Sequence, residues 1–157
     1  MAKRKKHKWV AGDVFRVTLS DGSYILGQIL SFEELALWSY VCALSGRRFG
    51  ADEEAGPADF NQGDILSVIF IDGRFDHPSF TYAGSATPMD FRRFLDIAPL
   101  RKTGFIGAKI YGCAVVMDFL NSYFGLDFWD QYLEPDYFQT MLLPHVALPE
   151  GLRYSKR

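Results

Sequence analysis

The side chains that could carry acid–base, nucleophilic or metal chemistry are scattered along this sequence. His7, His77 and His145 are far apart, and none has a second His or a Cys at the spacing of a zinc site. Cys42 and Cys113 lie in apolar contexts, which is typical of small buried side chains rather than of ligands or a disulfide. We therefore predict no metal site, no cofactor and no catalytic residue.

A group of carboxylates in the last third of the chain comprises Asp127, Asp130, Glu134 and Asp136. Two carboxylates act as general acid and base only in a pocket that shifts their pKa values, and no spacing here predicts such a pocket. Two other interpretations stay open: the acids cap and solvate a loop between helices, or they form an acidic binding face. Since the sequence also lacks a phosphate-binding loop, a dinucleotide fingerprint and a nucleophile elbow, we expect a protein that is not an enzyme.

Aromatic residues make up 16% of the chain, and several alternate with these acids. An aromatic centre with a charged rim is typical of a protein interface, and an acidic one suits a basic partner. The alternative is that Phe128, Trp129 and Tyr132 seal the helices onto the core. The residues that we predict to bind a partner are Phe124, Asp127, Phe128, Trp129, Asp130, Tyr132, Glu134, Asp136 and Tyr137.

Positive charge gathers at the opposite end of the chain. The first eight residues contain five bases, and no Lys or Arg occurs between Lys109 and Arg153. Affinity for a nucleic-acid backbone grows with the number of phosphates neutralised, so one short cluster argues against a nucleic-acid partner. A small nucleic-acid-binding β-barrel stays the alternative function. We interpret residues 1–8 as a basic flexible tail and residues 9–157 as a single domain.

The length of 157 residues suits one domain, since domains commonly contain about 100–200 residues. No apolar run approaches the roughly 20 residues that cross a bilayer, and the basic start does not lead into the apolar core of a signal peptide. We therefore expect a cytoplasmic protein without membrane contact.

The elements that must position these side chains begin with a hairpin. Phe15, Val17 and Leu19 alternate with polar residues, so they should share the buried face of a strand. Asp21-Gly22 supplies the turn, and residues 24–32 form the return strand. Gly27 in that strand predicts a bulge or a close contact.

Further strands are predicted for residues 35–44, 65–71 and 103–110, with a long loop over residues 45–64. Prolines interrupt residues 72–103, where only 89–97 could form a short helix or strand.

Helical spacing appears in the last third. Val116, Phe119, Leu120 and Tyr123 form one stripe of a helix that Gly125 should end. Pro135 should begin a short second helix. Strands followed by helices indicate an α+β fold: a strongly bent antiparallel sheet or small SH3-like barrel from the N-terminal strands, with one or two helices in the C-terminal third.

Two stretches together resemble the immunity protein 26 family of bacterial polymorphic toxin and contact-dependent inhibition loci. "KHKWVAGDVFRVTLSDGSYILGQIL" is similar to the family's opening, and "MDFLNSYFGLDFWDQYLEPDYFQTMLL" is similar to its closing segment. The resemblance covers about 25 residues at each end and does not extend over residues 32–116. It implies a small protein that binds and neutralises a cognate toxin domain.

Overall fold

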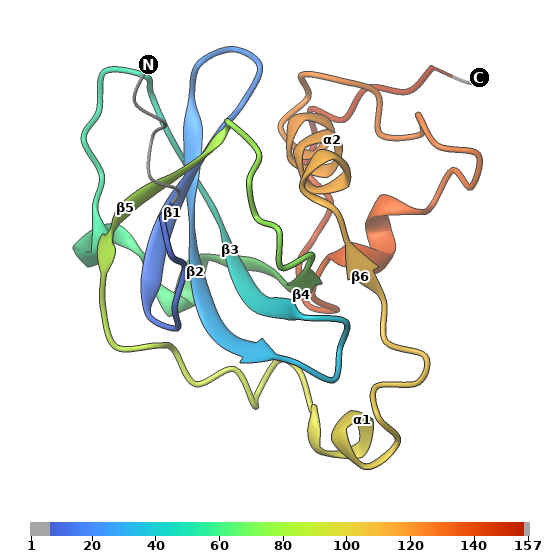
Figure 1. The fold of residues 1–157 in the computed structure, drawn as a ribbon. Helices are drawn as coiled ribbons and strands as arrows, with labels where there is room; N and C mark the ends of the chain where they lie inside the picture. Colours follow the sequence, from blue (N-terminus) through green and yellow to red (C-terminus); the bar gives the residue numbers. More distant parts are fainter. Residues whose placement is uncertain (1–6, 156–157) are drawn as a thin grey trace, which may run out of the picture.

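The computed structural model in Figure 1 describes residues 7–155 and is built on one six-stranded mixed sheet. The strands lie in the order β5-β1-β2-β3-β4-β6; β4 and β6 are parallel, and the other neighbouring pairs are antiparallel. The sheet is not closed into a barrel. The bounds are β1 Asp13–Thr18, β2 Tyr24–Glu33, β3 Ser39–Phe49, β4 Ile65–Ile71, β5 Phe80–Ser85 and β6 Ile110–Tyr111.

The part of the chain that the structure describes also contains two α-helices and three 3₁₀ turns, and the C-terminal segments lie on one side of the sheet in Figure 1. The main core lies there, where strand residues such as Phe15 and Leu44 share one cluster with Phe119 and Phe138. This confirms the predicted α+β fold with a bent sheet. The bounds are α1 Ala98–Lys102, α2 Cys113–Tyr123, η1 Pro57–Asp59, η2 Gln62–Asp64 and η3 Phe138–Met141.

The β1–β2 hairpin forms as predicted, with Phe15 and Val17 fully buried and Gly22 at a φ of 88° in the turn. Gly27 lies at a register shift between β2 and β3, directly under the ring of Phe15. A Cβ added at Gly27 would come within 2.3 Å of Phe15 Cζ, so the strand needs glycine there. Helix α2 also forms as predicted, and Gly125 follows it with a φ of 76°.

Several predicted elements are wrong in place or type. Strand β3 begins at Ser39 instead of residue 35 and continues through residues 45–49, where the sequence predicts a loop. Residues 103–107 form turns in place of a strand, because Gly104, Phe105 and Gly107 have positive φ values. Residues 89–97 form neither helix nor strand, and strand β5 instead lies earlier in the proline-interrupted region, at Phe80–Ser85.

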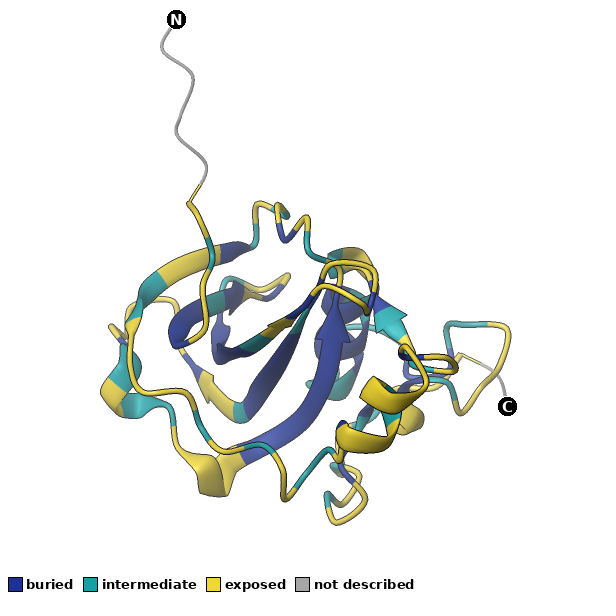
Figure 2. Cartoon of the chain, turned by 60° about the horizontal axis from the view of Figure 1, so that its bottom comes forward, coloured by how far each residue is buried: buried dark blue, intermediate teal, exposed yellow. Residues whose placement is uncertain are grey.

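The predicted second C-terminal helix is only the 3₁₀ turn η3, and Pro135 lies outside it. The strands are mostly buried, whereas α1 and several loops are exposed, as Figure 2 shows. No helix among residues 7–155 is long and apolar enough to cross a membrane. Residues 1–6 of the predicted tail lie outside the described residues.

Candidate functional site

Trp129, one of the predicted partner-binding residues, lies in the core and is 3% exposed. Its ring centroid is 5.5 Å from that of Phe138 and 6.1 Å from that of Phe119. Its backbone N–H donates to the carbonyl oxygen of Arg153 at 2.7 Å. Trp129 therefore joins the last residues of the chain to α2 and η3.

Two of the four predicted carboxylates accept hydrogen bonds from other residues of the same chain. Asp130 is 4% exposed, and its Oδ1 accepts hydrogen bonds from the backbone N–H of Ser155 at 2.8 Å and from its hydroxyl at 3.0 Å. Asp127 Oδ1 accepts from the backbone N–H of Phe128 at 2.7 Å. The guanidinium of Arg153 lies over the Phe128 ring, 4.8 Å from its centroid.

The remaining predicted rings are half-buried. The hydroxyl of Tyr132 donates to Asp118 Oδ2 at 2.7 Å, and its ring lies 5.1 Å from that of Tyr137. Burial, followed by the interaction with Asp118, raises the pKa of Tyr132 well above its usual value. Phe124 packs edge-on against Tyr123.

Glu134 and Asp136 are the exposed members of the predicted set. They lie with Leu133, which is 93% exposed, and Pro135 in what we call the acidic loop, residues 133–136. The nine predicted residues lie within residues 124–137, and in that segment only the acidic loop is exposed to solvent.

A second group of exposed apolar residues lies where β2 turns into β3. The turn holds Leu37 and Trp38, which are 79% and 62% exposed and have φ values of 53° and 59°. Gly73 packs closely against this turn. A Cβ added at Gly73 would lie 1.7 Å from the carbonyl oxygen of Trp38 and would overlap it. We call the four exposed residues Phe32, Leu35, Leu37 and Trp38 the β2–β3 tip.

Ring contacts lead from the β2–β3 tip across the end of the sheet. Phe32 lies 5.2 Å from Tyr40, which lies 5.9 Å from Phe75. Phe75 in turn contacts Trp9 at 4.9 Å. The tip is therefore continuous with the N-terminal segment that precedes β1.

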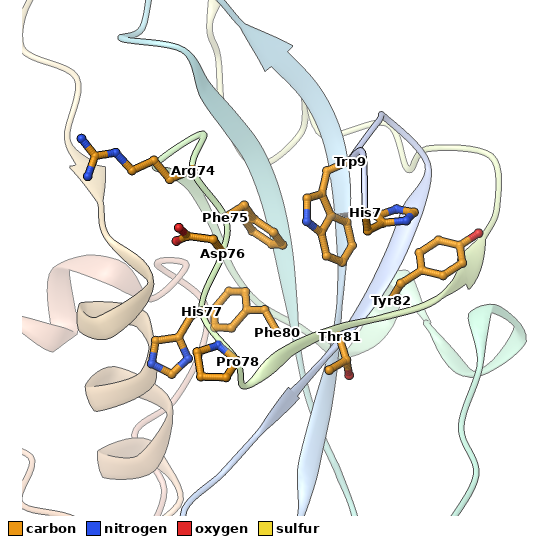
Figure 3. Close-up of a pocket in the computed structure, with 10 residues that line it drawn as sticks. All are labelled: His7, Trp9, Arg74, Phe75, Asp76, His77, Pro78, Phe80, Thr81 and Tyr82. Carbon is orange, nitrogen blue, oxygen red and sulfur yellow. The ribbon is translucent and has the colours of Figure 1, made fainter. Parts of the chain in front are cut away.

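This series of rings ends in a pocket of about 360 Å³, which we call the aromatic pocket (Figure 3). His7, Trp9 and Tyr82 lie on one side of the view, and His77 and Phe80 lie on the other. The His7 ring stacks on Tyr82 with centroids 4.2 Å apart. Further lining residues are Arg74, Phe75, Asp76, Pro78 and Thr81.

The two histidines of the aromatic pocket are engaged by their own neighbours. His7 Nε2 lies 2.9 Å from Oδ2 of the buried Asp13, and His77 Nδ1 accepts the backbone N–H of Ser79 at 3.1 Å. They lie apart in Figure 3, so they do not form an acid–base pair. The aromatic and charged side chains that line the pocket could contact a ligand by ring stacking and by charge interactions.

The thiols are poor nucleophiles. Both cysteines are free, and burial raises the pKa of Cys42 well above its usual value and that of Cys113 to about 11. Within residues 7–155, no three His, Cys, Asp or Glu side chains are grouped so that they could hold a metal ion.

Sequence reasoning missed both the β2–β3 tip and the aromatic pocket. Residues 35–38 resemble part of a strand because they are apolar. The exposure of Leu35, Leu37 and Trp38 and the positive φ values of Leu37 and Trp38 distinguish them. The pocket joins the N-terminal segment to residues 74–82, a pairing with no local signal. Comparisons of the chain with protein-family models, curated proteins and solved structures find no match.

Proposed function

We propose that this protein is an immunity-type inhibitor that binds and neutralises a cognate bacterial toxin domain, with the β2–β3 tip as its apolar anchor. The observation that carries the proposal is the exposure of Leu37 and Trp38 on a left-handed turn. The toxin class comes from the resemblance to the immunity protein 26 family at both ends of the chain.

Left-handed backbone at a residue other than glycine costs about 1–2 kcal/mol, and this turn places two such residues in succession. Strained backbone conformations of this kind are found most often at functional sites, where the position of the side chain serves binding at a cost in stability. Tryptophan is also among the residue types most enriched at the energetic centres of protein interfaces. The geometry of the tip therefore supports protein recognition.

Charge supports a basic partner. Glu134 and Asp136 are exposed in the acidic loop, and the sequence contains no Lys or Arg from residue 110 to residue 152. Complementary charge speeds association and selects the partner. A nuclease toxin would suit the acidic loop, because a protein that acts on nucleic acid carries a basic surface of its own.

The test is binding to the toxin encoded beside this gene, measured by titration calorimetry. Trp38→Ala should weaken binding at least tenfold, about 1.4 kcal/mol, because it removes the largest exposed anchor. Leu148→Ala is the control, since this residue is 40% exposed on a different part of the chain.

Circular dichroism should show that both variants keep the fold. If the Trp38→Ala variant bound the toxin with unchanged affinity, the β2–β3 tip would not be part of the interface. If the wild-type protein did not bind the toxin, the proposed function would be wrong.

A further inference from the structure

We propose that the toxin inserts one large apolar side chain, such as leucine, methionine or phenylalanine, into a second pocket of this protein, which we call the α1 pocket. This pocket has a volume of about 220 Å³ and lies between residues 89–92 and residues 96–101, at the start of α1. The inference rests on the proposed inhibitor function and adds a second anchor to the contact at the β2–β3 tip.

The α1 pocket has an apolar lining that continues into the core. Ile97 is 5% exposed and belongs to a core cluster with strand residues such as Val41. Met89 and Phe91 are half-buried and pack against the same cluster. Methionine is flexible and polarisable, so Met89 can adapt to the shape of an incoming side chain. The pocket therefore offers partly exposed apolar surface that a partner could cover.

The charged side chains at the α1 pocket already have partners within the protein. Arg92 donates to both carboxylate oxygens of Asp90, at 3.0 and 2.8 Å. Asp96 Oδ1 accepts the backbone N–H of Ala98 at 3.2 Å, and Arg101 forms an ion pair with the end of β2. A charged ligand would have to compete with these contacts, whereas an apolar side chain leaves them in place. The chemistry of the lining thus favours an apolar occupant.

The size of the α1 pocket suits a single side chain. Sites for small molecules and cofactors commonly have volumes of roughly 300–1,000 Å³, and this pocket is smaller. At protein interfaces, the side chains that contribute most to affinity fill well-packed pockets of the partner. We therefore assign the α1 pocket to one side chain of a protein partner rather than to a free ligand.

The α1 pocket lies at the same end of the molecule as the β2–β3 tip. Arg101 Nη2 donates to Glu33 Oε1 at 2.6 Å, and Glu33 is the last residue of β2, directly before the exposed turn. Ala36 in that turn shares a core cluster with Ile97 of the pocket. Figure 1 shows α1 and the turn between β2 and β3 together at the lower end of the view. One partner can therefore contact the tip and fill the pocket at the same time.

The first experiment fills the α1 pocket from within the protein. Ala98 is the first residue of α1, is exposed and lines the pocket, so Ala98→Phe should place a ring in the space that the toxin side chain needs. We expect this variant to bind the toxin encoded beside this gene at least tenfold more weakly in titration calorimetry. Urea denaturation should show that the variant stays folded.

Ala58→Phe is the matched control for this substitution. Ala58 is an exposed alanine in the short helical turn η1, which contacts β5 at the other edge of the sheet from β6. The control adds the same ring to the surface away from the α1 pocket, so it should keep the affinity of the wild-type protein.

A second measurement reports on the α1 pocket without any substitution. In protein labelled with carbon-13 at the methionine methyl groups, the NMR signal of Met89 should shift when the toxin is added. Met117 and Met141 are internal controls, because they lie in the main core and are 8% and 2% exposed. Since this measurement uses the wild-type protein, it decides the proposal even if the Ala98→Phe variant does not fold.

The proposal is wrong if the toxin binds the wild-type protein while the Met89 signal stays in place, or if a folded Ala98→Phe variant binds with full affinity. Either result leaves the inhibitor function and the β2–β3 tip intact. A Met89 signal that shifts with protein concentration in the absence of toxin would assign the pocket to a second copy of this chain and would also overturn the proposal. Absence of toxin binding by the wild-type protein would contradict the inhibitor function, and this inference with it.

Discussion

Two tryptophans of this protein, Trp129 and Trp38, differ in how far they are buried and therefore in their physical roles. Trp129 is 3% exposed within the core, whereas Trp38 is 62% exposed at the β2–β3 tip. A buried indole contributes mainly to folding through transfer from water and close packing. An exposed one is available to a partner.

The two tryptophans should therefore respond differently to truncation. Trp129→Ala should lower the free energy of unfolding by roughly 3–5 kcal/mol, because it leaves a cavity beside Phe119 and Phe138. Trp38→Ala should change it by less than about 1 kcal/mol. Urea denaturation followed by circular dichroism checks both values, and similar losses for both variants would contradict these assignments.

At the scale of elements, the turn between β2 and β3 is held in an unfavourable conformation by its surroundings. Its strands are paired over most of their length, from Tyr24 with Phe49 to Glu33 with Ser39. Gly73 allows the carbonyl of Trp38 to approach the loop after β4. Tertiary contacts thus impose the positive φ values of the turn.

Glycine at the strained position should stabilise the protein and weaken binding. Leu37→Gly relieves a positive φ, so we expect the free energy of unfolding to rise by up to about 1 kcal/mol while toxin affinity falls. Leu35→Gly is the matched control, because Leu35 is exposed in the same turn without a positive φ. That variant should lose stability by roughly 0.5–1 kcal/mol.

Chemical denaturation and calorimetry measure the two effects separately. Loss of stability in the Leu37→Gly variant would show that the turn is not strained at that residue.

At the scale of the whole molecule, charge is distributed unevenly. Bases crowd the N-terminus, which leads into the aromatic pocket, and the acidic loop lies in a segment without Lys or Arg. The net charge of −2 conceals this separation.

Reversing the charge of the acidic loop should slow association with a basic toxin. We expect Glu134→Lys with Asp136→Lys to reduce the association rate several-fold at low salt and much less at high salt, because exposed charges are screened. Stopped-flow fluorescence measures the rate. The control reverses Asp52 and Glu54, which are exposed in the loop after β3; an equal effect would indicate general charge rather than a local contact.

Local pattern by itself determined the hairpin of β1 and β2, strand β4, helix α2 and the glycines at positions 22, 27 and 125. These features depend on side-chain period and on the φ values that glycine permits, both of which are encoded by neighbouring residues. The resemblance to an immunity family also came from sequence and stays a prediction.

Only the tertiary structure decided which residues of these segments are buried. It placed Trp129 and Asp130 inside, left Leu37 and Trp38 outside, and brought His7 onto Tyr82 to form a pocket. Burial and pocket formation depend on contacts between segments far apart in the chain. The same apolar residue can fill a core or face a partner, and long-range packing selects between them.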